Sequence, residues 1–182
     1  MENKGIVIKI GGSLADAAEE VLSAITASSI PALIVPGGGA FADTVRKKNL
    51  DDDSAHWQAI SAMNRYATYL ATFGFPLTER CDMPKKGIHI LLPEKILREK
   101  DPLPHSWDVT SDSIALWIAQ TLKTPLLLIK SRDGDFVDPE YIDSYFKTLN
   151  QNSKTIVSAV NGRDIRKLQS VFQDISSKTA EF

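Results

Sequence analysis

Residues 5–13 read Gly-Ile-Val-Ile-Lys-Ile-Gly-Gly-Ser, and this stretch decides which fold we expect. The dense β-branched residues of Gly5–Ile10 predict a buried strand. The glycine pair that follows breaks this strand. Ser13 is then a candidate N-cap for a helix over Leu14–Ala27, whose apolar residues recur at helical spacing. The stretch therefore predicts a strand that turns into a helix through two glycines.

The same alternation of strand and helix continues along the chain. Further strands are predicted at Ala32–Val35, Ile88–Leu92, Leu126–Ile129 and Thr155–Val160. Further helices are predicted at Ala40–Lys48, Ser54–Phe73, Pro93–Lys100, Thr110–Leu122, Pro139–Leu149 and Arg163–Ile175. This order predicts an α/β fold, a three-layer αβα sandwich with a mainly parallel central sheet, formed by residues 1–182 as a single domain.

Composition excludes several classes of protein. The 182 residues carry 21 Lys+Arg against 23 Asp+Glu, so the chain has no basic field for a nucleic-acid backbone. Cys81 is the single cysteine, which rules out an intrachain disulfide and fits a reducing compartment. The sequence lacks a secretory leader and an apolar run of about 20 residues for a bilayer. We expect no nucleic-acid partner, no membrane partner and a cytoplasmic location.

The end of the first strand, Lys9–Ser13, has the residue types of a phosphate site. Glycine lets backbone N–H groups approach phosphate oxygens closely, and a helix N-terminus favours negative charge. Lys9 adds a mobile cation for the charge that develops in phosphoryl transfer. These residues alone are equally compatible with a tight turn whose lysine points to water.

Gly37, Gly38 and Gly39 end the second strand in a similar way, just before a predicted helix. They form either a loose connection or a second anion site that faces the first. In open α/β sheets, ligands bind beyond the carboxyl ends of the strands, where both glycine clusters are expected. Transfer between two anions requires such a pair of sites.

Asp112 is a third candidate at this edge of the sheet. Thr110 or Ser111 suits the N-cap of the following helix, and Asp112 would then lie in its first turn. Either these are capping residues and nothing more, or Asp112 holds Lys9 in place through a charge-assisted hydrogen bond.

Together these segments resemble the amino acid kinase family. The matching stretches follow the family's order across nearly the whole chain: Lys9–Ser13, Pro36–Gly39, Thr110–Ala115, Lys130–Gly134 and Val160–Gly162. The resemblance implies an ATP-dependent kinase in which Mg²⁺ enters with ATP and the partner is a small phosphorylated acceptor. It also implies a homo-oligomer, with an acceptor lobe over about residues 1–105 and a nucleotide lobe over about 106–182.

The resemblance also implies roles for individual residues. Lys9 is similar to the family's catalytic lysine and Asp112 to the aspartate that organises it. The remaining assignments are Gly11, Gly12 and Ser13 over the ATP phosphates, Gly37, Gly38 and Gly39 on the acceptor side, and Asp133 and Gly134 in the nucleotide half.

Asp51–Tyr66 is similar to the short members of the family, for which the resemblance implies methanofuran biosynthesis and an acceptor carrying a phosphate, a furan ring and a primary amine. His56 would bind the acceptor phosphate, or is a solvated histidine near a helix start. Trp57 and Tyr66 would flank the ring, although Trp57 has the spacing of a core residue. An acid of Asp51–Asp53 would pair with the amine, or all three form a solvated turn.

The chain departs from the family between the Asp-Gly turn and the last strand, where a glycine pair and a second nucleotide lysine are missing. Lys130 is our candidate for that catalytic role, and Lys154 is the alternative. Two other functions stay open at this point. One is a kinase with a carboxylate acceptor, and the other is a nucleotide- or anion-binding regulator without catalysis.

Overall fold

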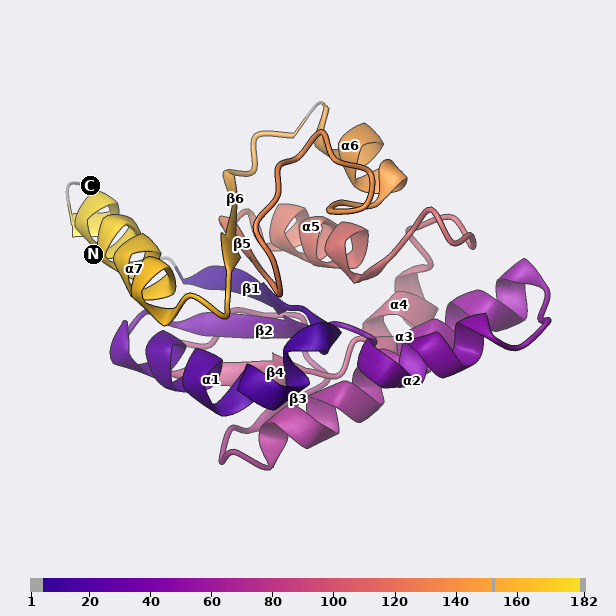
Figure 1. The fold of residues 1–182 in the computed structure, drawn as a ribbon, viewed down its shortest axis with the longest axis horizontal. Helices are drawn as coiled ribbons and strands as arrows, with labels where there is room; N and C mark the ends of the chain where they lie inside the picture. Colours follow the sequence, from indigo (N-terminus) through magenta and orange to yellow (C-terminus); the bar gives the residue numbers. More distant parts are fainter. Residues whose placement is uncertain (1–4, 152, 181–182) are drawn as a thin grey trace.

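The computed structural model describes residues 5–151 and 153–180 (Figure 1). Six strands form one sheet in the order β3-β4-β2-β1-β5-β6, and all of the neighbouring pairs are parallel. The strands are β1 Ile6–Ile10, β2 Ala32–Pro36, β3 Leu77–Thr78, β4 Ile88–Leu91, β5 Leu126–Lys130 and β6 Val157–Asn161. The α/β sandwich predicted from the sequence is confirmed, with a sheet that is wholly parallel.

Helices cover both faces of this sheet. They are η1 Gly12–Ala17, α1 Ala18–Ala27, α2 Gly39–Arg46, α3 Asp52–Ala71, α4 Glu94–Lys100, α5 Ser111–Leu122, α6 Ser144–Asn150 and α7 Ile165–Ala180. One apolar core lies between the sheet, α1, α7 and the second half of α3, and the other lies between the sheet, α4, α5, α6 and the first half of α3. Figure 1 shows α1 and α5 on opposite sides of the sheet. None of the helices in the described ranges combines the length and apolar character of a membrane span.

β1 lies in the middle of the sheet, and its alternation positions the lysine. Ile6, Ile8 and Ile10 belong to the core on one face, while Val7 belongs to the core on the other. Successive side chains of a strand point to opposite faces, so Lys9 leaves the strand on the same side as Val7. Because both faces are covered, the side chain of Lys9 is buried too, with the residue only 5% exposed.

The first helix differs from the prediction. Gly12–Ala17 form a 3-10 helix that is kinked at Leu14, and the regular helix α1 begins only at Ala18. Ser13 is not an N-cap, because its hydroxyl donates a hydrogen bond to Oγ of Ser131 at 3.0 Å. The parallel register of β1 and β5 ends both strands at the same edge, which brings the two serines together.

The helix predicted at Pro139–Leu149 is also different, because α6 begins only at Ser144. Asp143 caps it by accepting a hydrogen bond from the N–H of Phe146 at 2.7 Å. The preceding residues form turns that bury Tyr141 and Ile142 in the second core. β3 was not predicted, because two residues carry no recognisable alternation.

Helix α3 begins two residues before the predicted start, because Asp51 is its N-cap and accepts a hydrogen bond from the N–H of Ser54 at 2.9 Å. Ile60 and Met63 belong to one core and Tyr66 to the other, so this helix joins the two layers. It packs closely against α2, which leaves the sheet at Gly39.

The carboxyl ends of β1, β2 and β5 meet at one edge of the sheet. Lys9 is in register with Val35 on one side and Leu128 on the other, and Lys130 is the last residue of β5. The side chains and turns that follow these strands form the candidate site.

Candidate functional site

Two lysines share one aspartate at this edge. Nζ of Lys9 lies 2.8 Å from Oδ1 of Asp112, and Nζ of Lys130 donates a hydrogen bond to Oδ2 at 2.6 Å. Asp112 is 3% exposed and Lys9 is 5% exposed. The sequence left open whether Asp112 merely caps its helix, and the structure brings it to Lys9 from the first turn of α5.

The electrostatics of this group are set by burial and by the two ammonium groups. Burial alone raises the pKa of Asp112, but the charges of Lys9 and Lys130 outweigh it and hold that pKa below its ordinary value. Burial, together with the charge of Lys9, lowers the pKa of Lys130. With both ammonium groups charged, the three side chains carry a net positive charge, which favours an anion beside them.

Asp143 fixes the start of α5, and sequence reasoning missed it. Its carboxylate accepts hydrogen bonds from the backbone N–H groups of Thr110 and Ser113 at 3.0 and 3.2 Å. Both hydroxyls of these residues donate to it as well. The hydroxyl of Thr110, one of the two residues predicted as the N-cap, in turn caps α5 by accepting from the N–H of Asp112 at 3.3 Å. A signal existed in the sequence, because Asp143 precedes Ser144 as an N-cap precedes a helix.

The two glycine loops touch through their backbones. A β-carbon built on Gly12 would lie 2.1 Å from Cα of Gly39, and one on Gly37 would lie 2.6 Å from the backbone N of Gly12. Gly39 has a φ of +55°, which favours glycine. The N–H of Gly11 donates a hydrogen bond to the carbonyl of Ile129 at 2.9 Å, which attaches the loop after β1 to β5. The loops after β1 and β2 therefore form one continuous surface.

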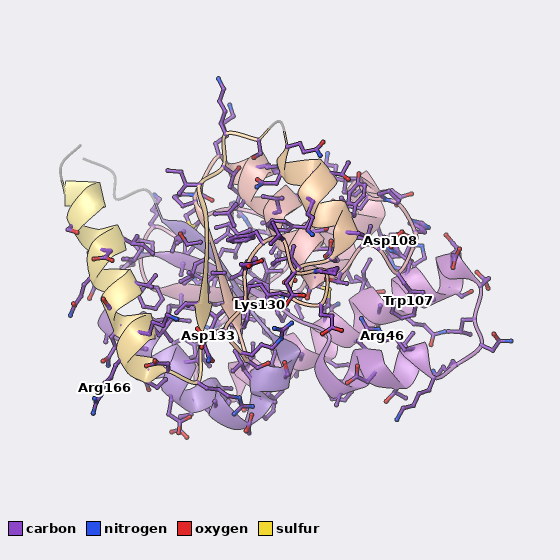
Figure 2. The ribbon with its side chains drawn as sticks, turned by 45° about the horizontal axis from the view of Figure 1, so that its top comes forward. Arg46, Trp107, Asp108, Lys130, Asp133 and Arg166 are labelled. Atoms are coloured by element: carbon purple, nitrogen blue, oxygen red, sulfur yellow. The ribbon has the colours of Figure 1, made fainter. Side chains whose placement is uncertain are left out.

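A cavity of about 850 Å³ opens beside the loops and the lysines. The residues proposed from the sequence that line it are Lys9, Gly12, Ser13, Gly38, Gly39, Asp52, His56, Asp112 and Lys130. In Figure 2, Lys130 lies near the middle of the molecule, with Arg46, Trp107 and Asp108 on one side of it. Arg46 and Trp107 line the same cavity, with the guanidinium 5.2 Å from the centre of a ring of the indole.

His56 lines the cavity but is not the solvated histidine that the sequence left as an alternative. It is 9% exposed, and its ring stacks on that of His105 with centroids 4.1 Å apart. Burial, helped by the charge of His105, lowers the pKa of His56 to about 4. Its imidazole is therefore neutral near pH 7 and can offer an anion a hydrogen bond but no charge.

Trp57 and Tyr66, which the sequence offered as partners of a ring, do not line the cavity. Trp57 packs edge-on against His105 and lies under the guanidinium of Arg98. Tyr66 is 2% exposed, and its hydroxyl donates to the carbonyl of Gly11 at 3.4 Å. Trp107 is the tryptophan that lines the cavity, from the segment between α4 and α5.

Asp133 and Gly134 lie outside the cavity lining. Asp133 forms an ion pair with Lys167 at 2.5 Å, and Gly134 leaves room for Tyr141, since a β-carbon there would lie 2.4 Å from its ring. In Figure 2, Asp133 lies on the side of Lys130 away from Arg46. The nucleotide-binding role of Asp133 and Gly134 stays a prediction.

The two candidates for a second lysine lie at opposite edges of the sheet. Lys130 ends β5 and contacts Asp112. Lys154 precedes β6 and lines a separate depression with Lys123 and Thr124, near the amino end of β5. Of the two, only Lys130 lines the cavity. Within the described ranges, no group of three or more His, Cys, Asp or Glu side chains is arranged to hold a metal ion.

Comparisons with known proteins give relatives in sequence and in fold. The chain is 32% identical over 179 residues to [5-(aminomethyl)furan-3-yl]methyl phosphate kinase of Methanocaldococcus jannaschii, in an alignment that covers 91% of this chain and 78% of that protein. The fold is similar to the crystal structure of uridylate kinase from Archaeoglobus fulgidus, with a TM-score of 0.63 and 14% identity over 94% of this chain and 95% of the other. No protein-family model matches the chain.

Proposed function

We propose that this chain, which belongs to the amino acid kinase family, transfers the γ-phosphoryl group of ATP to the phosphate of a small phosphomonoester. The acceptor we favour is the aminomethylfuran-methyl phosphate named for the archaeal relative, and the products would be a diphosphate of methanofuran biosynthesis and ADP. The observation that carries the proposal is the pair of lysines on Asp112, with Lys9 buried and Lys130 partly buried, beside both glycine loops.

In this proposal the reaction is a direct in-line displacement. An oxygen of the acceptor phosphate forms a bond to the γ-phosphorus, the bond from that phosphorus to the β–γ bridging oxygen breaks, and ADP leaves with the electron pair. Lys9 stabilises the charge on the transferred group, and Asp112 positions Lys9. Lys130 neutralises charge on the nucleotide side. The enzyme needs no covalent intermediate.

The two glycine loops would position the reactants. Gly12 and Ser13 face the ATP phosphates, and Gly38 and Gly39 face the acceptor, with His56 as a neutral hydrogen-bonding partner. Their contact supports this assignment, because loops in van der Waals contact bring donor and acceptor phosphates close enough to react. Residues of the predicted nucleotide lobe, from about 106 onward, supply Asp112 and Lys130.

The residues present fit a Mg²⁺ ion that arrives on the nucleotide. The two acids beside the lysines are already engaged, Asp112 by two ammonium groups and Asp143 by donors from Thr110 and Ser113. Phosphate oxygens and water would therefore supply most of the ligands, as is common for Mg²⁺ in phosphotransferases. When bound, the ion would neutralise charge on the β- and γ-phosphates.

An acceptor screen tests the proposal. Purified protein with Mg-ATP is offered phosphomonoesters, with and without a furan ring, and carboxylates such as acetylglutamate, while ADP release and the phosphorylated product are measured. We expect a diphosphate product from the aminomethylfuran phosphate. Turnover of the carboxylates instead would replace the acceptor class, and ATP binding without turnover of any acceptor would contradict the kinase assignment.

A further inference from the structure

The three acids at the start of α3 have three different surroundings. Asp51 is the N-cap and accepts a hydrogen bond from the N–H of Ser54 at 2.9 Å. Asp53 is bound to a ring nitrogen of His105, whose other nitrogen lies 2.8 Å from Asp101. Both carboxylates therefore have a structural partner, which leaves the acid between them.

Asp52 faces the cavity and, within the described ranges, has no ion pair or side-chain hydrogen bond. Other acids around the cavity are engaged: Asp16 with Arg163, Asp43 with Arg46, and Asp108 with the hydroxyl of Ser144. Glu140 also lines the cavity, but it lies in the segment before α6, on the side that we assign to the nucleotide. Asp52 is thus the carboxylate available on the acceptor side.

The face of α3 that lines the cavity runs from Asp52 through His56 to Ile60, residues that are spaced by four. Eight residues of helix correspond to about 12 Å. Ile60 is buried in the core that also contains Val7, on the face of the sheet from which Lys9 projects. Asp52 therefore marks the end of the cavity away from the lysines.

The cavity consequently has opposite charges at its two ends. Lys9 and Lys130 give the inner end a net positive charge even with Asp112 between them. Arg46 also lines the cavity, but its guanidinium is directed to the ring of Trp107 and to Asp43, at 5.2 and 3.5 Å. The carboxylate of Asp52 is left to attract a cation at the outer end.

This polarity matches an acceptor with a phosphate on one arm of a ring and an amine on the other, as in the name of the archaeal relative. We propose that Asp52 determines acceptor specificity by pairing with the ammonium group of such a phosphomonoester while its phosphate lies beside Lys9. The inference rests on the proposed function. It selects Asp52 from the run Asp51–Asp53, within which the sequence alone did not favour one acid.

The test compares two acceptors in two variants. The acceptors are the aminomethylfuran phosphate and its analogue in which a methyl group replaces the aminomethyl group. The variants are Asp52→Asn and the matched control Asp53→Asn, which removes a charge one residue further along the same helix turn. The readout is the ratio of kcat/KM between the two acceptors, taken with KM for each acceptor and with ADP release.

We expect wild type and Asp53→Asn to prefer the amine, and Asp52→Asn to reduce that preference by about two- to fivefold, mainly through KM, as for an exposed ion pair. Asp52→Glu should restore most of it. If Asp52→Asn keeps the wild-type ratio, or if wild type turns over both acceptors without preference, the inference fails while the kinase assignment stands. If wild type turns over neither acceptor, the proposed function fails and the inference falls with it.

Discussion

Gly12 and Gly39 touch through their backbones at the carboxyl edge of the sheet, so closely that Gly12 cannot accept a side chain at the contact. A β-carbon on Gly12 would lie 2.1 Å from both Cα and N of Gly39. One residue follows β1 and the other follows β2, and these strands are parallel neighbours. The contact therefore fixes the distance between the two loops on which the proposed transfer depends.

Gly12→Ala should separate these loops. We expect overpacking to lower the free energy of unfolding by about 1–3 kcal/mol and misplacement of the phosphates to lower kcat/KM by about 10²-fold. The matched control is Gly74→Ala, at φ +95° with nothing within 4 Å of its β-carbon. It carries backbone strain but lies away from the cavity, so urea unfolding should shift while kcat/KM stays. Equal losses of activity in both variants would contradict the role of the contact.

Lys9→Ala should abolish most of the turnover and leave the fold intact. Asp112 keeps the ammonium group of Lys130 as a partner, so the buried carboxylate is not left unpaired. We expect kcat to fall by about 10²–10³-fold, as for loss of one transition-state donor. ADP release and far-UV circular dichroism are measured together, and unchanged ATP consumption in a folded variant would refute the assignment of Lys9.

Lys130→Ala and Lys154→Ala separate the two candidates for the second nucleotide lysine. Lys130 contacts Asp112 beside the cavity, whereas Lys154 lies at the opposite edge of the sheet. We expect Lys130→Ala to raise KM for ATP and lower kcat, and Lys154→Ala to match wild type in both. An effect of Lys154→Ala on KM for ATP as large as that of Lys130→Ala would show that the nucleotide site is elsewhere.

Asp112→Asn should destabilise the protein and change how its stability depends on pH. Removing one partner of a buried charge cluster costs about 3–5 kcal/mol, and here it would leave two ammonium groups facing each other. The pKa of Asp112 is lowered from its ordinary value of 3.8. Its stabilising effect is therefore present above that value and is lost as pH falls through the lower pKa of the folded state.

Urea unfolding of wild type and Asp112→Asn over a range of pH measures this effect. The difference in unfolding free energy between them should be largest well above pH 3.8 and shrink in acid. A difference that stays constant into acid would mean that the charge of Asp112 is not what stabilises the site.

His105→Gln should weaken the loop before α5 in a pH-dependent way. A hydrogen bond to Asp101, assisted by Asp53, raises the pKa of His105 above its ordinary value of 6.5. The resulting stability is complete below 6.5 and is lost as pH rises through the higher pKa of the folded state. The difference in unfolding free energy between wild type and variant should thus depend on pH. It should be larger about one pH unit below 6.5 than about two units above 6.5. Loss of the same size at both pH values would contradict an ionic role for His105.

Much of the fold could be predicted because its signals are local. The β-branched residues of β1 and the glycines after β1 and β2 indicate parallel strands that end in tight turns. The residue types narrowed the N-cap of α5 to Thr110 or Ser111, and the structure has Thr110. Ser13 was read wrongly as a cap, because nothing local indicates that its hydroxyl bonds instead to Ser131, a residue 118 positions away.

The candidate site was only partly predictable. Lys9, Asp112 and the glycines were proposed from their types and order, but that Lys130 lines the cavity while Lys154 does not depends on the strand register. Asp143 and Trp107 were missed because their contacts with Thr110 and Arg46 come from segments whose approach is decided by packing. The same cause explains why Trp107 lines the cavity and Trp57, the tryptophan proposed from the sequence, does not.

The sequence by itself determined most of the order of strands and helices, without β3, and the glycine turns, because these follow from backbone preferences and apolar periodicity over a few residues. Only the tertiary structure decided that Lys9 and Lys130 meet on Asp112, that Gly12 touches Gly39, and which acid of Asp51–Asp53 faces the cavity. These relationships depend on the register of parallel strands and on side-chain packing between distant segments, and no local pattern in the chain records either.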